Sequence, residues 1–482
     1  MSRNRAGRFV LSTIAVVVLM AACATPTPQT VVQTVEVPVT VPPVEVEVEV
    51  TVPVTVQVPV TSIPPATATP QAGKKVIIWW SHWANEVLRR EVIEQIVADY
   101  EAAHEDVDII LSWWDITALQ PALRAVMTAG EGQPDISTDA DLTNMVKAGW
   151  VLDISDKVPW DNFQPGIKEA SGVPGVPGLY KFNVGIQQLM LFYNKDIFAE
   201  LSIEVPADYT FTQAEFVDVV QKCNDGGYDG VGNASGNRNY PGLFPIWAAL
   251  TNLEGTAEET KYNNGLKLWD TDNARQVLDW TVQLRDAGLW PETYSTMTID
   301  EFFVYFHTLR KSCMLYIPSW YPGRAFKPVE AGGQSPDFQV GMLRYPLMDG
   351  AEHADELWAN GDSGYMVLSS SKHPEIATDI LSFAAQPKYA ALWAAKTFIP
   401  SALKYDPVTD WPTDIEGVDQ WQWYFAEMNK VYAGMNFVIG TDAPCGDFLD
   451  ARTTALNQGL PLGLVTVDEA ISLLNAHQCP AS

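Results

Sequence analysis

The sequence predicts an α/β fold for the part of the chain after residue 74, and two observations carry this prediction. Residues 75–79 form a short apolar run that is typical of a buried strand, and residues 85–100 repeat apolar side chains at helical spacing. The same order then recurs, with an apolar run at 107–111, a helical pattern at about 119–129 and a short strand at 135–137. Strands that alternate with helices favour a mostly parallel sheet with helices on both faces.

Length and composition restrict the class of protein. A chain of 482 residues has room for about three domains. Hydrophobic residues make up 47% and aromatic residues 11%, which excludes a wholly disordered or collagen-like chain. Asp and Glu number 59 against 30 Lys and Arg, a formal net charge of -29 that repels phosphate backbones. We therefore expect no nucleic-acid partner.

The N-terminus has the pattern of an export signal. Arg3, Arg5 and Arg8 precede an apolar run at 9–20 that is too short for an ordinary membrane span but typical of a signal peptide. The run ends at Ala-Ala-Cys23, which resembles a bacterial lipobox. We predict residues 1–22 to be a lipoprotein signal peptide, with Cys23 lipidated and the protein extracytoplasmic, anchored to the outer face of the cell membrane. An ordinary cleavage site with an incidental cysteine is the alternative.

Residues 23–73 are predicted to be a disordered stalk. They are rich in Val, Thr, Pro and Glu, and the frequent prolines remove the donors that a β-sheet needs. About fifty residues at roughly 3.1 Å each reach up to about 150 Å when fully extended. A structured β-solenoid is the alternative. Residues 74–482 are then the globular domain.

The remaining cysteines are predicted to form disulfides. Their number is even, and an exported chain meets oxidising surroundings. We favour Cys445 with Cys479, because both lie in the C-terminal stretch, and Cys223 with Cys313 as the second pair. No CxxC motif or paired His spacing is present, so we expect no metal site.

A set of short motifs recurs along the globular part of the chain. The motifs are Gly132-Gln133-Pro134-Asp135-Ile136, Ala148-Gly149-Trp150-Val151-Leu152-Asp153, Val176-Pro177-Gly178, Phe192-Tyr193-Asn194-Lys195-Asp196-Ile197-Phe198, Ser319-Trp320, Gly361-Asp362-Ser363, Ser370 to Ala377 and Phe398-Ile399-Pro400-Ser401. Each motif is weak alone, but the ordered set, behind a lipobox, resembles that of the extracellular solute-binding proteins of sugar-type (family 1) ABC importers. One departure is the segment 104–107, where the family usually has a proline before the second strand.

This resemblance implies a two-lobed, periplasmic-binding-protein-like fold (type II) with a solute cleft between the lobes, no enzymatic activity and no cofactor. It places crossings between the lobes near 182–188, 339–345 and 398–401. Lobe one is then about 75–183 plus 345–398, and lobe two about 188–340 plus 402–482. The expected partners are a small-molecule solute, most simply a mono- or oligosaccharide, and the transmembrane permease subunits of an ABC importer. We expect the protein to be a monomer.

Sugars present flat C–H faces and rims of hydroxyl groups, so their sites combine aromatic side chains with polar ones. Ligands in open α/β sheets bind at the carboxyl ends of strands, where such residues occur here. Strand side chains alternate between faces, so we do not expect every member of the Trp79-Trp80 and Trp113-Trp114 pairs to point into a cleft. The predicted ligand-binding residues are Trp80, His82, Trp114, Asp115, Asp139, Asn183, Arg238, Trp247, Trp320 and Asp362.

Each of these residues also has a purely structural interpretation. A tryptophan at a strand end is stabilising as a core residue, by roughly 1.5–3 kcal/mol. Asp139 or Asp141 is a candidate N-cap for a helix near residue 142. His82 is equally at home in a solvated loop, and a lone arginine such as Arg238, Arg324 or Arg344 commonly pairs with a nearby carboxylate.

Other functions remain open from the sequence. A peptide, a polyamine or a sugar phosphate is the alternative solute. An extracytoplasmic glycoside hydrolase needs only two carboxylates at a cleft, and the stalk alone is compatible with an adhesin. The segment 361–364 is similar to a serine-protease nucleophile motif, but no accompanying histidine segment is present.

Overall fold

A computed structural model describes residues 71–406, 408–412, 415, 418–442 and 444–480. Residues 67–482 form one compact unit by their internal contacts, and the fold below is that of this unit. The predicted signal peptide, the predicted lipidation site Cys23 and most of the predicted stalk lie outside the described residues.

The first sheet confirms the α/β prediction. Its strands β1, β2 and β3 are parallel, at the positions that the sequence indicates, while β10 and β4 add antiparallel pairs and make the sheet mixed. The order across the sheet is β2-β1-β3-β10-β4. Its strands are β1 (Lys75–Ser81), β2 (Val107–Trp113), β3 (Ile136–Thr138), β4 (Phe182–Asn183) and β10 (Gly364–Val367).

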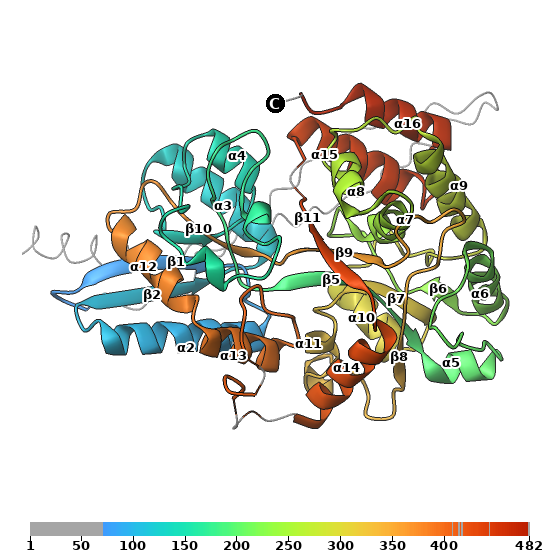
Figure 1. The fold of residues 1–482 in the computed structure, drawn as a ribbon, viewed down its shortest axis with the longest axis horizontal. Helices are drawn as coiled ribbons and strands as arrows, with labels where there is room; N and C mark the ends of the chain where they lie inside the picture. Colours follow the sequence, from blue (N-terminus) through green and yellow to red (C-terminus); the bar gives the residue numbers. More distant parts are fainter. Residues whose placement is uncertain (1–70, 407, 413–414, 416–417, 443, 481–482) are drawn as a thin grey trace, which may run out of the picture. The chain divides into compact units, whose positions relative to one another are not determined.

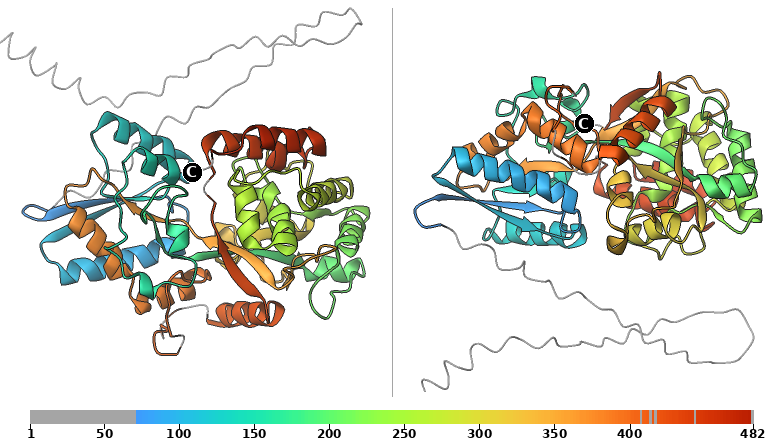
Figure 2. Two further views of the ribbon diagram at one scale, coloured as in Figure 1. Left: turned by 45° about the horizontal axis from the view of Figure 1, so that its top comes forward. Right: turned by 90° about the horizontal axis from the view of Figure 1, so that it is seen from below.

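Helices cover the first sheet and complete what we call the first lobe (Figure 1). Helices α12 and α13 pack against α2, and the right-hand view of Figure 2 shows them side by side. Helix α3 begins after Asp115, whose carboxylate accepts the Thr117 amide, and ends at Gly130, which has a left-handed φ of 74°. The helices are α2 (Val87–Ala103), α3 (Ile116–Ala129), α4 (Leu142–Lys147), α12 (Pro374–Ala384) and α13 (Pro387–Thr397), with short turns η2 (Trp160–Asn162) and η3 (Glu169–Ser171).

A second, six-stranded sheet forms the centre of what we call the second lobe. Strand β5 lies between β9 and β7, both antiparallel to it, and β8 also pairs with β5. Strands β11 and β6 add parallel edges. The strands are β5 (Ile186–Asn194), β6 (Asp229–Val231), β7 (Ser312–Pro318), β8 (Val340–Leu343), β9 (Glu356–Gly361) and β11 (Asn436–Gly440).

Helix α7, whose residues are nearly all buried, packs against α8 and α9 in the second lobe. Three of the others, α6, α10 and α16, begin with a Thr-x-x-Glu capping box, which satisfies the free amides of the first turn. The elements are α5 (Lys195–Glu200), α6 (Gln213–Asp225), α7 (Phe244–Glu254), α8 (Thr256–Asn263), α9 (Asp272–Asp286), α10 (Ile299–His307), α11 (Pro322–Ala325), α14 (Val418–Val431), α15 (Gly446–Arg452) and α16 (Val467–Ala476), with turns η4 (Pro241–Leu243), η5 (Val329–Ala331) and η6 (Thr453–Gly459).

The chain crosses between the two sheets in short segments. It passes from β4 to β5 through residues 184–185, where the Ile186 amide donates to the Pro400 carbonyl at 2.8 Å. One expected boundary is wrong, because residues 345–361 do not join the first lobe. Strand β9 pairs with β5 in the second sheet, and the chain returns to the first sheet only at β10. Strand β8 ends at Leu343, a turn follows at 349–350, and the buried run of β9 then extends the same sheet.

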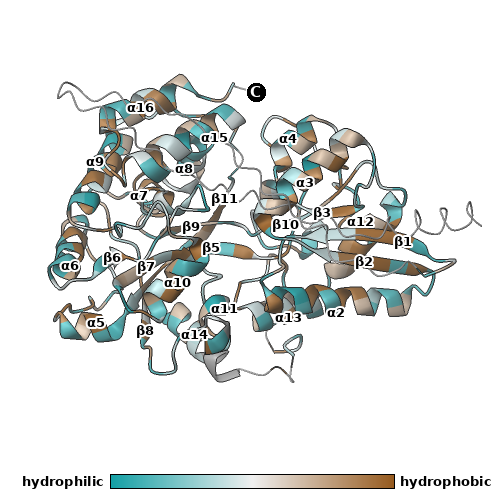
Figure 3. Cartoon of the chain, turned by 180° about the vertical axis from the view of Figure 1, so that it is seen from behind, coloured by the Kyte–Doolittle hydropathy of each residue, from teal (hydrophilic) through white to brown (hydrophobic). Residues whose placement is uncertain are grey.

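Alternation along the strands divides the core of the first lobe. Trp79 belongs to a cluster on one face of the sheet, and Trp80 to a separate cluster on the other. Strands in both sheets are apolar, whereas the helices carry polar residues on their outer sides (Figure 3). Each of the described helices is too short or too polar to cross a bilayer.

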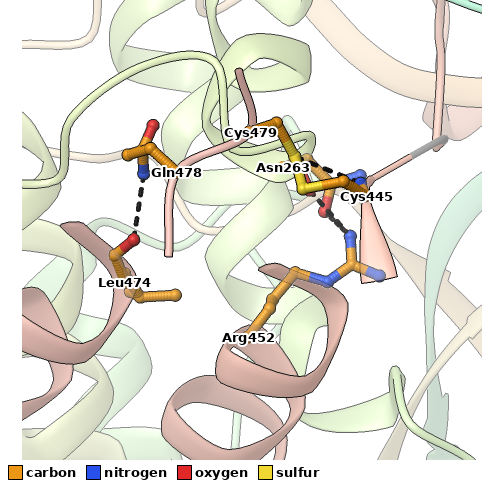
Figure 4. Close-up of a disulfide and its surroundings, with 6 residues drawn as sticks. All are labelled: Asn263, Cys445, Arg452, Leu474, Gln478 and Cys479. Atoms are coloured by element: carbon orange, nitrogen blue, oxygen red, sulfur yellow. Dashed lines mark hydrogen bonds between the residues drawn. A yellow bond between two sulfur atoms is a disulfide. The ribbon is translucent and has the colours of Figure 1, made fainter. Parts of the chain in front are cut away.

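Two disulfides, both in the second lobe, match the pairings favoured from the sequence. Cys223 of α6 bonds Cys313 of β7, across 90 residues. Cys445 bonds Cys479, across 34 residues, and fixes the segment after α16 beside the start of α15 (Figure 4). Loop closure of this kind restricts the unfolded chain and so stabilises the fold.

Candidate functional site: a polar and aromatic pocket between the two sheets

The candidate site is a pocket of about 720 Å³ lined by residues of both lobes. Its size falls within the usual range of small-molecule sites, about 300–1,000 Å³. A neighbouring cavity of about 270 Å³ shares Asp139, Lys181, Asn360 and Asp442 with it, so the space extends in that direction.

The wall from the first lobe is polar because three parallel strands end there. His82 follows β1, Asp115 follows β2 and Asp139 follows β3. The His82 Nδ1 atom lies 3.1 Å from the Thr138 hydroxyl oxygen. Burial, together with nearby arginines, lowers the pKa of His82 to about 3, so its ring is neutral at ordinary pH.

Asp139 is held by two contacts. Its Oδ1 accepts the Gly364 amide at 3.2 Å, and its Oδ2 lies 3.3 Å from Lys181 Nζ. Burial raises the pKa of Asp139, and Lys181 opposes this shift. Neither Asp139 nor Asp141 caps α4 through its side chain, whereas Asp115 does cap α3.

The wall from the second lobe is aromatic. Trp247 of α7 and Trp358 of β9 stack with ring centroids 4.7 Å apart and planes at 24°. The Trp247 indole N–H donates to Asn263 Oδ1 at 2.8 Å, which fixes the ring. Trp320, after β7, packs its edge against Phe303 at 5.6 Å. All three rings are at least 91% buried, so each exposes only a small part of its face to the pocket.

A charged cluster joins the two walls. Glu86, beside the start of α2, lies 2.7 Å from Arg89 Nε and 2.9 Å from Nη2 of Arg324, which is in the second lobe. Arg89 Nη1 is also 3.1 Å from Asp362 Oδ2, an ion pair without hydrogen-bond alignment, and Gln187 donates to Asp362 Oδ1.

Glu86 is the ionised carboxylate at the centre of this cluster. Burial by itself raises the pKa of Glu86, but Arg89 and Arg324 more than offset burial and bring that pKa to about 2. The Arg89 guanidinium also lies over the rings of Trp83 and Trp393, at 5.1 and 5.6 Å from their centroids, which fixes its position.

Arg238, in the loop between β6 and η4, contrasts with these arginines. Its Nη1 donates to the backbone oxygen of Asn237 at 2.9 Å. Throughout the described part of the chain, no carboxylate lies within ion-pair distance of it. Its backbone is fixed, because Asn457 Nδ2 donates to the Arg238 carbonyl at 3.2 Å.

Behind the aromatic wall, a buried arginine holds the segment after β11. Arg452 Nη1 donates to the Asn263 carbonyl at 3.0 Å and to Asp442 Oδ1 at 2.9 Å. Glu259 of α8 is completely buried, and burial raises the pKa of its carboxyl well above the ordinary value. Arg452 thus supports Asp442, which reaches the pocket.

Most of the residues predicted from the sequence lie together in this pocket. Trp80 and Trp114 do not, because they pack on each other 4.6 Å apart in the core beside α3. Asn183 also lies outside it, fully buried, and donates to the Ser171 hydroxyl at 2.8 Å. The predicted residues that line the pocket are His82, Asp115, Asp139, Arg238, Trp247, Trp320 and Asp362.

Sequence reasoning missed Trp358, Glu86, Arg89, Lys181 and Gln187. A sequence signal for Trp358 was available, because it lies in the strand that ends at Gly361, just before the predicted binding residue Asp362. The charged residues carry no such signal, because ion pairs of this kind form between segments far apart in the chain.

The pocket has the size and the lining of a small-molecule binding site. Among the described residues, no group of His, Cys, Asp or Glu side chains is arranged to hold a metal ion. Two sheets with a polar and aromatic pocket between them define the class of two-lobed solute-binding proteins.

Comparison with known proteins names the family. Residues 86–391 match the bacterial extracellular solute-binding protein family, and because this is more than half of the chain, the chain belongs to that family. Its members bind solutes and are not enzymes. A search of the curated proteins gives no match.

Solved structures share the fold. A protein from a study of xylan utilization by Caldanaerobius polysaccharolyticus superposes with a TM-score of 0.68, at 18% identity over 83% of this chain and 99% of that one. A chitin oligosaccharide binding protein gives 0.66, at 18% identity over 84% and 98%. Apo RafE from Streptococcus pneumoniae gives 0.59, at 18% identity over 86% and 100%. At such identities the likeness shows the fold alone.

Proposed function

We propose that the pocket binds a mono- or oligosaccharide, which the protein delivers to the membrane permease of an ABC importer. The observation that carries this proposal is the pairing of an aromatic wall with a polar one. Trp247, Trp320 and Trp358 offer ring surface for the C–H face of a sugar, while His82, Asp115 and Asp139 offer donors and acceptors for its hydroxyl groups.

Several proteins of similar fold support the same class of solute. They include the chitin oligosaccharide binding protein and a complex of RafE with raffinose. The pocket volume and its extension towards Asp442 fit more than one sugar unit better than a single small ion.

Transport requires that the solute favour one arrangement of the lobes. Hinge closure around a ligand is the general behaviour of periplasmic binding proteins. A sugar that contacts both walls stabilises the closed arrangement by those shared contacts, and the permease then recognises that arrangement. A micromolar ligand supplies about 8 kcal/mol in total, which leaves enough for this shift.

The predicted location follows from the N-terminus. Lipidation of Cys23 would tether the protein to the outer face of the membrane, and residues 24–73 would let the globular unit reach solute and permease. Metabolic labelling with a radioactive fatty acid tests this, because the label should appear in the wild-type chain and be lost in Cys23→Ala. Label retained in the variant would place the anchor elsewhere.

A thermal-shift screen of the compact unit, residues 67–482, tests the solute class. The panel contains neutral and acidic sugars, oligosaccharides, polyamines, peptides and sugar phosphates. A true ligand at a hundredfold excess over its dissociation constant stabilises the protein by about 2.7 kcal/mol. Stabilisation by a sugar that is recovered unchanged supports the proposal. Stabilisation by polyamines or peptides alone, or by no compound, would exclude a sugar importer.

A further inference from the structure

We infer that the pocket end beside Arg238 receives a carboxylate, so that the solute is an acidic sugar, an oligosaccharide with a uronate residue. This inference rests on the proposed carbohydrate function and narrows its substrate class. It is carried by the charges on this side of the pocket and by the lack of a carboxylate partner for one guanidinium group.

The charges around the arginines are unevenly paired, although carboxylates outnumber cations in the pocket as a whole. Arg89 and Arg324 contact the buried carboxylates of Glu86 and Asp362, whereas Arg238, which lines the same pocket, contacts neither. Glu86 and Asp362 have side chains only 20% and 1% exposed, and both are in contact with Arg89 or Arg324.

Asp300, a further carboxylate near Arg324, does not neutralise the charge of Arg238. Asp300 contacts Arg324 at 3.2 Å, but its side chain is 59% exposed, so water screens most of its charge. A single positive charge is therefore left over at this end, on Arg238.

Arg238 is also placed to use that charge. Its backbone is fixed by Asn457, Nη1 donates to a backbone oxygen, and the guanidinium also forms a side-chain hydrogen bond with Tyr240, but no carboxylate pairs with it. The guanidinium is partly buried, and burying a charge without an anion is costly. In a chain with 59 acidic residues, such an arginine suggests that its partner is a ligand.

The titratable groups that face Arg238 do not supply the missing anion. His82 and Glu86 lie across from it, and Glu86 is already shared between Arg89 and Arg324. Burial lowers the pKa of His82, so the ring is neutral, and burial raises the pKa of Tyr240, so its hydroxyl remains a neutral donor. Tyr240 and Asn239 thus add hydrogen bonds without charge.

The other charged groups of the pocket and of the neighbouring cavity give an anion no second free cation. Asp115 has no cation within ion-pair distance in the described structure, and Lys181 and Arg452 are engaged by Asp139 and Asp442. The acidic group of a ligand is therefore expected at Arg238.

A carboxylate suits the geometry and the charge better than a phosphate. Guanidinium and carboxylate are planar and form paired, charge-assisted hydrogen bonds. A uronate carries one negative charge, which balances the one excess cation, whereas a sugar phosphate carries up to two and would leave this end negative.

The test compares acids with their methyl esters on the full chain, purified in detergent. Isothermal titration is carried out with tri-galacturonate and with short xylo-oligosaccharides bearing glucuronate, each as the free acid and as the methyl ester. The ester keeps the hydroxyl groups and removes the charge, and it adds one methyl group to each carboxyl. We expect at least one acid to bind at least tenfold more tightly than its ester.

Variants of the pocket arginine locate the effect. Arg238→Gln should reduce the acid-to-ester ratio to near one, and Arg238→Lys, which keeps the charge but not the fork, should retain part of it. The control Arg275→Gln removes the same charge from a surface ion pair with Asp468, outside the pocket, and should leave the ratio unchanged.

Each contrary result has a distinct meaning. Equal or tighter binding of the ester, or of neutral sugars, would overturn the uronate inference and leave the carbohydrate function standing. Tighter binding of the matched sugar phosphate or sulfate would overturn the choice of carboxylate. A full acid preference in folded Arg238→Gln would overturn the role of Arg238. Failure of every sugar, acidic or neutral, to bind would overturn both proposals.

Discussion

The two lobes contribute unlike surfaces to the same pocket. The first lobe supplies polar groups from strand ends and helix starts, with His82, Asp115 and Asp139 among them, and no disulfide occurs in its described residues. The second lobe supplies the aromatic rings, and both disulfides lie within it. The polar wall thus suits the edge of a sugar, and the aromatic wall suits its face.

The tryptophans also differ between the two lobes, since some lie in the core and others line the pocket. Trp80 and Trp114 lie at strand ends of the first sheet, yet they point to one face of that sheet and join its core. Trp247 lies on a helix and Trp320 in a loop, and both reach the pocket. Proximity to a strand end therefore does not decide the role of an aromatic residue, because the direction of its side chain does.

The largest expected effect concerns the disulfides of the second lobe. Replacing Cys223 and Cys313 with Ser should lower the free energy of unfolding by about 4–5 kcal/mol, and replacing Cys445 and Cys479 by about 3–4 kcal/mol, since the first pair closes the longer loop. Urea denaturation of both double variants measures the difference. If removal of the Cys445–Cys479 disulfide, which closes the 34-residue loop, lowered the free energy of unfolding more, chain entropy would not be the source of the stabilisation.

Next in size is the loss of a core tryptophan from the first lobe. Trp80→Ala should destabilise the protein by about 3–5 kcal/mol, because it leaves a cavity beside Trp114 and α3. The affinity of the folded fraction for a sugar should stay the same, since Trp80 does not line the pocket. Denaturation and calorimetry on the same preparation separate the two quantities. A tenfold loss of sugar affinity in the folded variant would instead show that Trp80 contributes to binding.

Much of this architecture could be predicted from the sequence, and the limits have a physical cause. Local periodicity is sufficient for β1, α2, β2, α3 and β3, because strands and helices repeat apolar residues differently. The role of Trp114 and the lobe of β9 depend on pairing between distant segments. The ion pair between Glu86 and Arg324 joins residues 238 positions apart, and no local pattern marks such a contact.

A smaller effect is expected at the ion pairs that join the lobes. The pKa of Glu86 is about 2 in the folded chain against an ordinary 4.5, so the folded state binds fewer protons than the unfolded one between these values. The stabilisation is then present above about pH 4.5 and is lost as the pH falls towards 2. Glu86→Gln should lower stability by on the order of 2–3 kcal/mol at pH 7.

The pH profile of that variant provides the check. Unfolding curves of wild type and Glu86→Gln should approach each other as the pH falls from 4.5 towards 2. The control Glu94→Gln on the same helix breaks an exposed pair with Arg90 and should cost under about 1 kcal/mol at any pH. A constant difference between Glu86→Gln and wild type would show that the lost contribution is packing rather than charge.

The aromatic wall is tested by a milder change. Trp247→Phe keeps a ring but loses part of the stack on Trp358 and the hydrogen bond to Asn263, so sugar affinity should fall about tenfold, or about 1.4 kcal/mol. Isothermal titration measures this with a sugar identified in the screen. The matched change Trp80→Phe in the first lobe should leave sugar affinity unaltered. Equal losses of affinity in the two variants would mean that Trp247 has no special role in binding.

The smallest expected effect concerns His82 in the polar wall, where we expect sugar affinity not to depend on pH. Burial lowers the pKa of His82 to about 3, so in the folded chain its ring carries no charge anywhere between pH 5 and pH 8. Sugar affinity should therefore show no step near pH 6.5 in wild type, and none in His82→Gln. A step that occurs in wild type and disappears in the variant would mean that His82 titrates in the pocket, and the polar wall would then change its charge in the physiological range.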